Sequence, residues 1–277
     1  MSTSKMSNLL KRTIFGLILV TIVSGSILLS EYSMLGLVML IYVLGTVELH
    51  KLIALKGNTI TLFSSLAGIL IIGVTYLATA GLIPLYALAV MLIVLLTLAI
   101  FIYVIAGKNS YTSVASMFFG GLWIAVSLSL YAALGWQNET GVYDPTMLLI
   151  VIILIWVNDI GAFLVGSFIG KNPLAPSISP GKTWEGFISG IVLTMIGGIL
   201  VYRITLTYSL YHWIILSILI SLGATIGDLF ESKIKREYGA KDSGNIIPGH
   251  GGILDRFDSL FFSAPLVYLV LIITEMI

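Results

Sequence analysis

The sequence has 277 residues, of which 58% are apolar and 10% are charged, and its mean hydropathy is +1.08. Soluble domains are roughly 45–50% apolar and about 25% charged, so this chain has too little polar surface to cover a water-soluble globule. Lys and Arg total 14 against 13 Asp and Glu, and there is no cysteine. These values exclude a nucleic-acid binder, a disulfide scaffold and a disordered chain, and they indicate a polytopic membrane protein.

Apolar runs long enough to cross a bilayer recur along the whole chain, since a spanning helix needs about 20 residues. The runs do not alternate between apolar and polar residues as the strands of a membrane barrel do. We therefore predict an all-α fold of about nine transmembrane helices. The predicted spans cover about 13–30, 34–55, 59–80, 84–106, 113–134, 146–169, 186–208, 211–230 and 260–277.

The cations predict the orientation of these spans, because Lys and Arg concentrate in cytoplasmic loops. With nine spans, the N-terminus and the even-numbered loops share one side and hold 13 of the 14 cations, while Arg203 lies on the other side. We predict a cytoplasmic N-terminus and, in a prokaryote, an integral protein of the cell membrane. A signal peptide is disfavoured because no convincing small-x-small cleavage site follows the first run.

Polar residues divide the chain into two parts. Residues 1–145 are predicted to form helices that pack and face lipid, with possible homodimer contacts. Their ionisable pair, Glu48 and His50, is expected to lie at the cytoplasmic edge of the second span without a further role. Residues 146–277 are predicted to carry the functional site, with cytoplasmic loops over 170–185 and 231–259.

The second part carries acids inside predicted spans. Asp159, next to Asn158, lies within the sixth span, and Asp228 and Glu231 close the eighth. A carboxylate at that depth is costly unless it faces protein, water or a cation. Small residues at four-residue spacing are expected to let the sixth, seventh and eighth helices approach closely. They are Ala162, Gly166, Gly170, Gly186, Gly190, Gly223 and Gly227.

The predicted loop over 231–259 mixes cations, carboxylates and glycines more densely than solvation requires. The glycines around His250 can present backbone N–H groups to an anion, and Lys and Arg supply donors for phosphate oxygens. Asp228, Asp255 and Asp258 offer the hard oxygen ligands that Mg²⁺ shares with substrate phosphates. This combination predicts a cytoplasmic site for a metal-bound polyphosphate.

The other predicted loop contains Gly181-Lys182-Thr183, which matches the end of a P-loop. The first glycine of that motif is replaced by Pro176, so we reject a P-loop. Lys182 remains a predicted phosphate contact.

These motifs resemble the signature of the phosphatidate cytidylyltransferase family, also called CDP-diacylglycerol synthases. The signature consists of Ser, Lys-Arg, Lys-Asp, His-Gly-Gly, Asp-Arg and a final Asp, in this order and at fixed spacing. Asp159–Ala162 and Ser179–Gly186 are similar to the family as well, although Ile160 and Phe163 lack hydroxyls that it often has, and Gly181 replaces a frequent Lys. The signature is matched by Ser232, Lys235, Arg236, Lys241, Asp242, His250, Gly251, Gly252, Asp255, Arg256 and Asp258.

The resemblance implies transfer of CMP from CTP to phosphatidic acid or a related lipid phosphate, giving CDP-diacylglycerol and pyrophosphate. It implies Mg²⁺, paired with a second cation such as K⁺, held by Asp228 and Asp255, with Asp258 and Asp159 as further ligands. The implied catalytic residues are Asp228, Asp255, Lys241, His250 and Arg256. The implied substrate-binding residues are Ser179, Lys182, Thr183, Ser232, Lys235, Arg236, Asp242, Gly251 and Gly252.

Several alternatives stay open at this point. His250 has a structural alternative as a hydrogen-bonding residue of its turn, and Asp242 and Asp258 divide evenly between ligand and scaffold. Glu231 and Glu237 are expected to pair on the helix surface with Lys235 and Lys241. The alternative functions are a CTP-dependent polyprenol or phytol kinase and, less favoured, an ion-coupled transporter.

Overall fold

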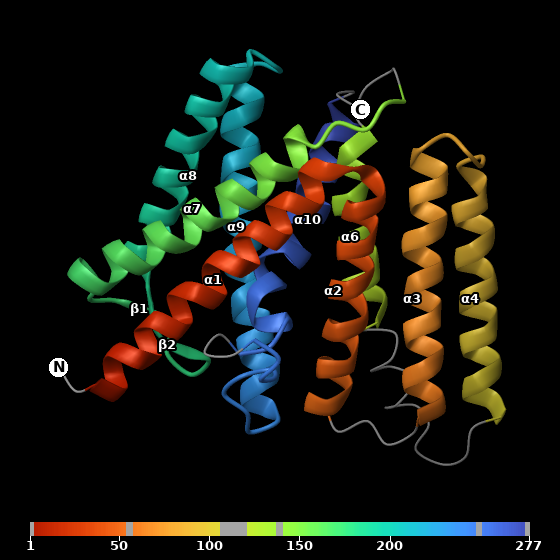
Figure 1. Cartoon of the computed structure of the whole chain (residues 1–277), viewed down its shortest axis with the longest axis horizontal. Coiled ribbons are helices and arrows are strands. Elements are labelled where there is room, and N and C mark those ends of the chain that lie inside the picture. The colour runs from red at the N-terminus through yellow and green to blue at the C-terminus, as the bar shows by residue number, and fades with distance from the viewer. Residues whose placement is uncertain (1–2, 54–57, 106–120, 137–140, 248–250, 275–277) are drawn as a thin grey trace. The chain divides into compact units, whose positions relative to one another are not determined.

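The computed structural model describes residues 3–53, 58–105, 121–136, 141–247 and 251–274 (Figure 1). Side chains are described over these ranges except for 3–12, 58–61 and 99–105. The chain divides into two compact units, each described by itself. The first unit comprises Met1–Pro145 and Asp242–Arg256, and the second comprises Thr146–Lys241 and Phe257–Ile277.

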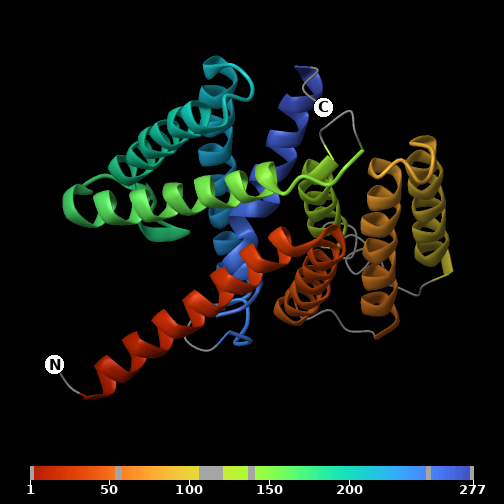
Figure 2. The same ribbon diagram turned by 45° about the horizontal axis from the view of Figure 1, so that its top comes forward.

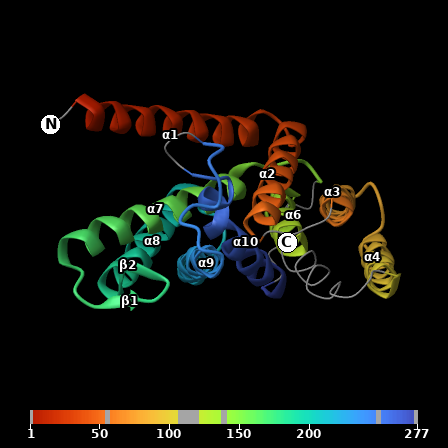
Figure 3. The same ribbon diagram turned by 90° about the horizontal axis from the view of Figure 1, so that it is seen from below.

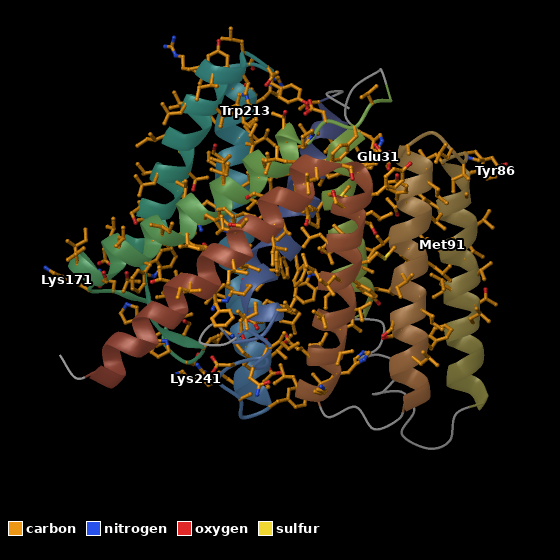
Figure 4. The ribbon with its side chains drawn as sticks, in the orientation of Figure 1. Glu31, Tyr86, Met91, Lys171, Trp213 and Lys241 are labelled. Atoms are coloured by element: carbon orange, nitrogen blue, oxygen red, sulfur yellow. The ribbon has the colours of Figure 1, made fainter. Side chains whose placement is uncertain are left out.

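The first unit is a bundle of apolar helices. Helix α2 packs against α1, α3 and α6, and α3 also packs against α4 and α6 (Figure 2). Figure 4 shows Glu31 and Tyr86, which begin α2 and α4, at the same end of this bundle. Its helices are α1 (Thr3–Leu29), α2 (Glu31–Leu52), α3 (Asn58–Thr79), α4 (Tyr86–Ile105) and α6 (Trp123–Ala133), which a short 3-10 turn extends to Trp136.

The second unit contains three mutually packed helices and a β-hairpin. Helix α7 packs against α8 and α9, and α8 packs against α9. The hairpin connects α7 to α8 (Figures 1 and 3), and Figure 4 shows Lys171 and Trp213 at opposite ends of the unit. Its elements are α7 (Thr146–Ile169), β1 (Pro173–Ala175), β2 (Ser179–Thr183), α8 (Trp184–Thr205) and α9 (Leu210–Glu237). Helix α10 (Leu254–Ile273) begins in the segment grouped with the first unit and continues in the second.

Small residues set how closely the helices of the second unit approach. A Cβ at Gly186 of α8 would lie 2.7 Å from the carbonyl oxygen of Ala162 and 3.2 Å from the Cα of Gly166, both on α7. A Cβ at Gly223 of α9 would lie 2.8 Å from the backbone nitrogen of Ser263 on α10. The predicted close approach is therefore confirmed at Gly186, between the sixth and seventh spans, whereas Gly223 of the eighth span approaches α10 and neither of the two predicted partners.

The described part of the chain confirms a helical membrane protein. Among its residues, six helices are long and apolar enough to cross a membrane, and three shorter apolar helices cover Thr13–Leu29, Tyr86–Leu98 and Trp123–Trp136. Helix α7 has the bounds predicted for the sixth span. The prediction of an all-α fold missed the hairpin, whose antiparallel strands pair Pro173 with Thr183.

The structure corrects both ends of the loop predicted over 231–259. Helix α9 continues to Glu237, where Gly239, with φ of +68°, ends it in the left-handed conformation that glycine adopts readily. Helix α10 begins at Leu254, so Asp255 and Asp258 lie on a helix rather than in a loop. The division between units falls after Pro145, and residues 242–256 group with the first unit.

Candidate functional site

The second unit gathers four carboxylates on three helices. Asp159 comes from α7, Asp228 and Glu231 come from α9, and Asp258 comes from α10. Asp258 interacts electrostatically with the other three. Glu231 and Asp258 are buried, with exposed fractions of 3% and 8%. Acidic side chains from three helices are therefore gathered in one region of this unit.

Lys182 brings a cation to these acids. Its Nζ lies 2.7 Å from Oδ2 of Asp228, and Oδ1 of Asp228 accepts a hydrogen bond from the Ser232 hydroxyl at 3.2 Å. The side chains of Lys182 and Asp228 remain 26% and 40% exposed, so both are accessible to a ligand. The structure thus brings together three residues that the sequence predicted for the site.

The hairpin is fixed to its surroundings at several points, which positions Lys182. The Arg236 Nε donates to the Ile178 carbonyl between the two strands at 3.4 Å. The Asn172 side chain donates to Glu185 at 2.7 Å. The Thr183 hydroxyl accepts the Gly186 N–H at 3.2 Å and so caps α8. Thr183, predicted to bind substrate, therefore has a structural role at the start of this helix.

A buried amide holds Asp159 in place. The Asn158 side chain is 3% exposed, and its Oδ1 accepts a hydrogen bond from the Ser221 hydroxyl of α9 at 2.5 Å. Its Nδ2 donates to Oδ1 of Asp159 at 3.1 Å. Sequence reasoning noted Asn158 only as a neighbour of Asp159 and missed Ser221, since a lone serine in an apolar span carries no distinguishing signal.

The pairing predicted for the end of α9 is partly confirmed. Lys235 and Glu231 form an ion pair at 2.8 Å, as expected for this i, i+4 spacing. The pair is buried, with exposed fractions of 8% and 3%, so its predicted surface location is wrong. Oε1 of Glu237 lies 3.9 Å from Nζ of Lys233, so Glu237 pairs with Lys233 rather than with the predicted partner Lys241.

In the first unit, Asp255 organises the segment that precedes α10. Its Oδ2 accepts three hydrogen bonds, from the Ser243 N–H at 3.0 Å, the Ser243 hydroxyl at 2.9 Å and the Gly252 N–H at 2.7 Å. Gly251 has φ of +84°, a conformation that an L side chain would strain. His250 lies outside the described residues, so its predicted role stays a prediction.

Glu48 of α2 contacts the same residues, contrary to the expectation that it has no further role. Its Oε2 accepts the Leu254 N–H at 3.0 Å and the Ser243 hydroxyl at 3.4 Å, and the residue is 3% exposed. His50 lies instead with its Nε2 3.2 Å from the Ser64 hydroxyl. Sequence reasoning missed this role, although an acid in an apolar run was a signal.

Each unit by itself contains part of the predicted site. The first contains Asp242, Gly251, Gly252, Asp255 and Arg256. The second contains Asp159, Ser179, Lys182, Thr183, Asp228, Ser232, Lys235, Arg236, Lys241 and Asp258.

The donor chemistry of the carboxylates fits Mg²⁺. Within the described ranges, no group of three or more His, Asp or Glu side chains is arranged to hold a metal ion by itself. Protein Mg²⁺ sites commonly use only one or two carboxylates, because water and substrate phosphates supply the other oxygens. The accessible carboxylate of Asp228 meets this requirement.

Comparison with known proteins identifies chains of similar sequence. A sequence model of the cytidylyltransferase family matches residues 10–274. The phosphatidate cytidylyltransferase of Bacillus subtilis is 32% identical over 244 residues, which cover 84% of this chain and 87% of that protein. The enzyme of the same name from Staphylococcus saprophyticus is 38% identical over 61% of this chain and 64% of its own length. That from Staphylococcus haemolyticus is 46% identical over 45% and 48%.

Replacing Ser221 with Ala is expected to destabilise the second unit, because the buried Oδ1 of Asn158 loses its donor. The expected loss is about 1 kcal/mol, measured as a lower melting temperature in detergent. Ser217→Ala is the matched control, since Ser217 is also buried in α9 but donates only within its own helix, to the Trp213 carbonyl. Equal losses in the two variants would contradict a special role for the Ser221–Asn158 bond.

Proposed function

Because the chain belongs to the cytidylyltransferase family, we propose that it transfers CMP from CTP to phosphatidic acid or a related lipid phosphate. The observation that carries this proposal is the ion pair of Lys182 and Asp228, which sets an accessible cation beside a cluster of carboxylates in a membrane protein. Similarity to enzymes named phosphatidate cytidylyltransferase supplies the substrate class. The products are CDP-diacylglycerol and pyrophosphate.

The reaction joins two anions, which defines what the protein must provide. An oxygen of the lipid phosphate forms a bond to the α-phosphorus of CTP, and the bond from that phosphorus to the oxygen bridging to the β-phosphate breaks, which releases pyrophosphate. The attacking oxygen is already ionised, so no strong general base is needed. The protein therefore accelerates the reaction mainly by positioning the two phosphates and neutralising their charge. Lys182, Arg236 and the other cations of the site perform this neutralisation.

Mg²⁺, together with a second cation such as K⁺, is part of this proposal. Asp228 and Asp255 are the proposed ligands, and Asp159 and Asp258 are further ligands or orient the first two. When bound, Mg²⁺ neutralises phosphate charge and orients the phosphate groups of the nucleotide. Support comes from the four carboxylates gathered in the second unit, whose mutual repulsion a cation would relieve.

CTP labelled at either phosphate position distinguishes transfer of CMP from the alternative lipid kinase. Label at the α-phosphate is expected to enter the lipid, because CMP is the group transferred, whereas label at the γ-phosphate leaves with pyrophosphate. Asp228→Asn, which removes the charge that faces Lys182, is the inactive control. The measurement is chromatography of extracted lipid at several Mg²⁺ concentrations.

Lipid labelled from the γ position would contradict the proposal and favour the kinase. Full transfer by Asp228→Asn would instead remove Asp228 from the proposed metal ligands.

The membrane topology is the second part of the proposal. We propose nine spans, a cytoplasmic N-terminus and a site that faces the cytoplasm. Within the described residues, six long and three shorter apolar helices each overlap one of the predicted spans, and 13 of 14 cations fall on one side of this arrangement. A homodimer is compatible with this topology.

Single cysteines test this topology cleanly, because the chain has none of its own. A cysteine at Lys171, beside the hairpin, is expected to be protected from a membrane-impermeant thiol reagent in intact cells. A cysteine at Thr207, between α8 and α9, is expected to react. Labelling after permeabilisation serves as the control for both positions. The opposite pattern of labelling would contradict a cytoplasmic site.

A further inference from the structure

We propose that Glu48 of α2 is a positioning residue for Ser243, Gly244, Gly252 and Leu254, the described residues of the segment that leads into Asp255. The inference rests on the proposed function, in which Asp255 acts on the nucleotide. It assigns a task to the first part of the chain, which the sequence presented only as packing helices.

Glu48 caps α10 from a different helix. The Leu254 N–H, at the first residue of α10, has no partner within its own helix, and it donates to Oε2 of Glu48 at 3.0 Å. A carboxylate at this position also interacts favourably with the helix dipole. The two residues are 206 positions apart in the sequence, so this contact fixes where α10 begins relative to α2 within the first unit.

Ser243 connects Glu48 to Asp255. The Ser243 hydroxyl lies 2.9 Å from Oδ2 of Asp255 and 3.4 Å from Oε2 of Glu48. The same Oδ2 of Asp255 accepts the N–H groups of Ser243 and Gly252. A displacement of the Glu48 carboxylate would therefore reach Asp255 through one shared hydroxyl and through the start of α10.

The segment lies directly against the Glu48 side chain at two glycines. The three atoms nearest to a Cβ added at Gly244 all belong to Glu48. A Cβ at Gly252 would meet the Ser243 hydroxyl and the same carboxylate. Leu254 in turn packs on α2, where a Cβ at Gly45 would lie 3.3 Å from its Cδ2. The C-terminal turns of α2 thus pack directly against Gly244, Gly252 and Leu254.

Packing alone gives no reason for an acid at position 48. The residue is 3% exposed, and a buried carboxylate is costly unless donors satisfy it. The donors to its Oε2 are the Leu254 N–H and the Ser243 hydroxyl, both from the residues that Glu48 is proposed to position. His50, 4% exposed and at the same end of α2, contacts Ser64 of α3 instead, so it is a matched control for the loss of a buried polar side chain.

The first test compares Glu48→Ala, Glu48→Gln and His50→Ala in the full-length protein. We expect Glu48→Ala to speed hydrogen–deuterium exchange in a peptide over 243–254 and to lower kcat/KM for CTP by roughly 10–100-fold, with a higher Mg²⁺ requirement. Glu48→Gln keeps an acceptor for the Leu254 N–H and should remain near wild type. His50→Ala should lower the melting temperature but leave exchange over 243–254 and the Mg²⁺ requirement unchanged.

The second test is a double-mutant cycle of Gly244→Ala and Glu48→Ala, in which only activities are compared. Gly244→Ala is expected to reduce activity, because its Cβ displaces Glu48. In the Glu48→Ala background the same change should cost little, because the atoms it meets are gone.

Additive losses in this cycle, or unchanged exchange and activity in Glu48→Ala, would overturn the inference. A wild-type protein that transfers no label from CTP would overturn the proposed function instead, and the exchange measurement would still show whether Glu48 holds the segment.

Discussion

Ionised groups in an apolar chain need partners, and this constraint accounts for the polar contacts of the second unit. A carboxylate inside a membrane helix is costly unless a donor or a cation faces it. Asp228 is paired with Lys182, Glu231 with Lys235, and Asp159 is hydrogen-bonded to Asn158. Such pairs also fix side chains in place, so the groups that make the acids tolerable in the membrane also set the orientation that the proposed function requires of them.

The fold positions these groups by different means in its two units. In the second, glycines bring the backbones of α7, α8 and α9 close together, and a short hairpin carries Lys182 to Asp228. In the first, Glu48 and Asp255 hold the segment before α10 through Ser243. Asp228 and Asp255, both proposed as metal ligands, thus have different surroundings. Asp228 faces Lys182, and Asp255 accepts hydrogen bonds from two backbone N–H groups and the Ser243 hydroxyl.

Much of this could be predicted from the sequence because membrane helices depend on local composition. The bounds of α7 and its close approach to α8 at Gly186 followed from hydropathy and spacing alone. The extension of α9 was missed because charged residues were taken to mark a loop, although Glu231 and Lys235 have helical spacing. The hairpin strands are too short to show a pattern, and the partner of Glu48 lies 206 residues away, where local reasoning has no reach.

The central claim is that the acids of the second unit, with Asp228 foremost, hold a divalent cation beside the nucleotide. Electron paramagnetic resonance of Mn²⁺ in the presence of CTP tests it directly, since bound and free Mn²⁺ give different spectra. We predict Mn²⁺ bound to the wild-type protein, displaced by excess Mg²⁺ and largely lost in Asp228→Asn. Binding of the same strength in wild type and variant would contradict the account.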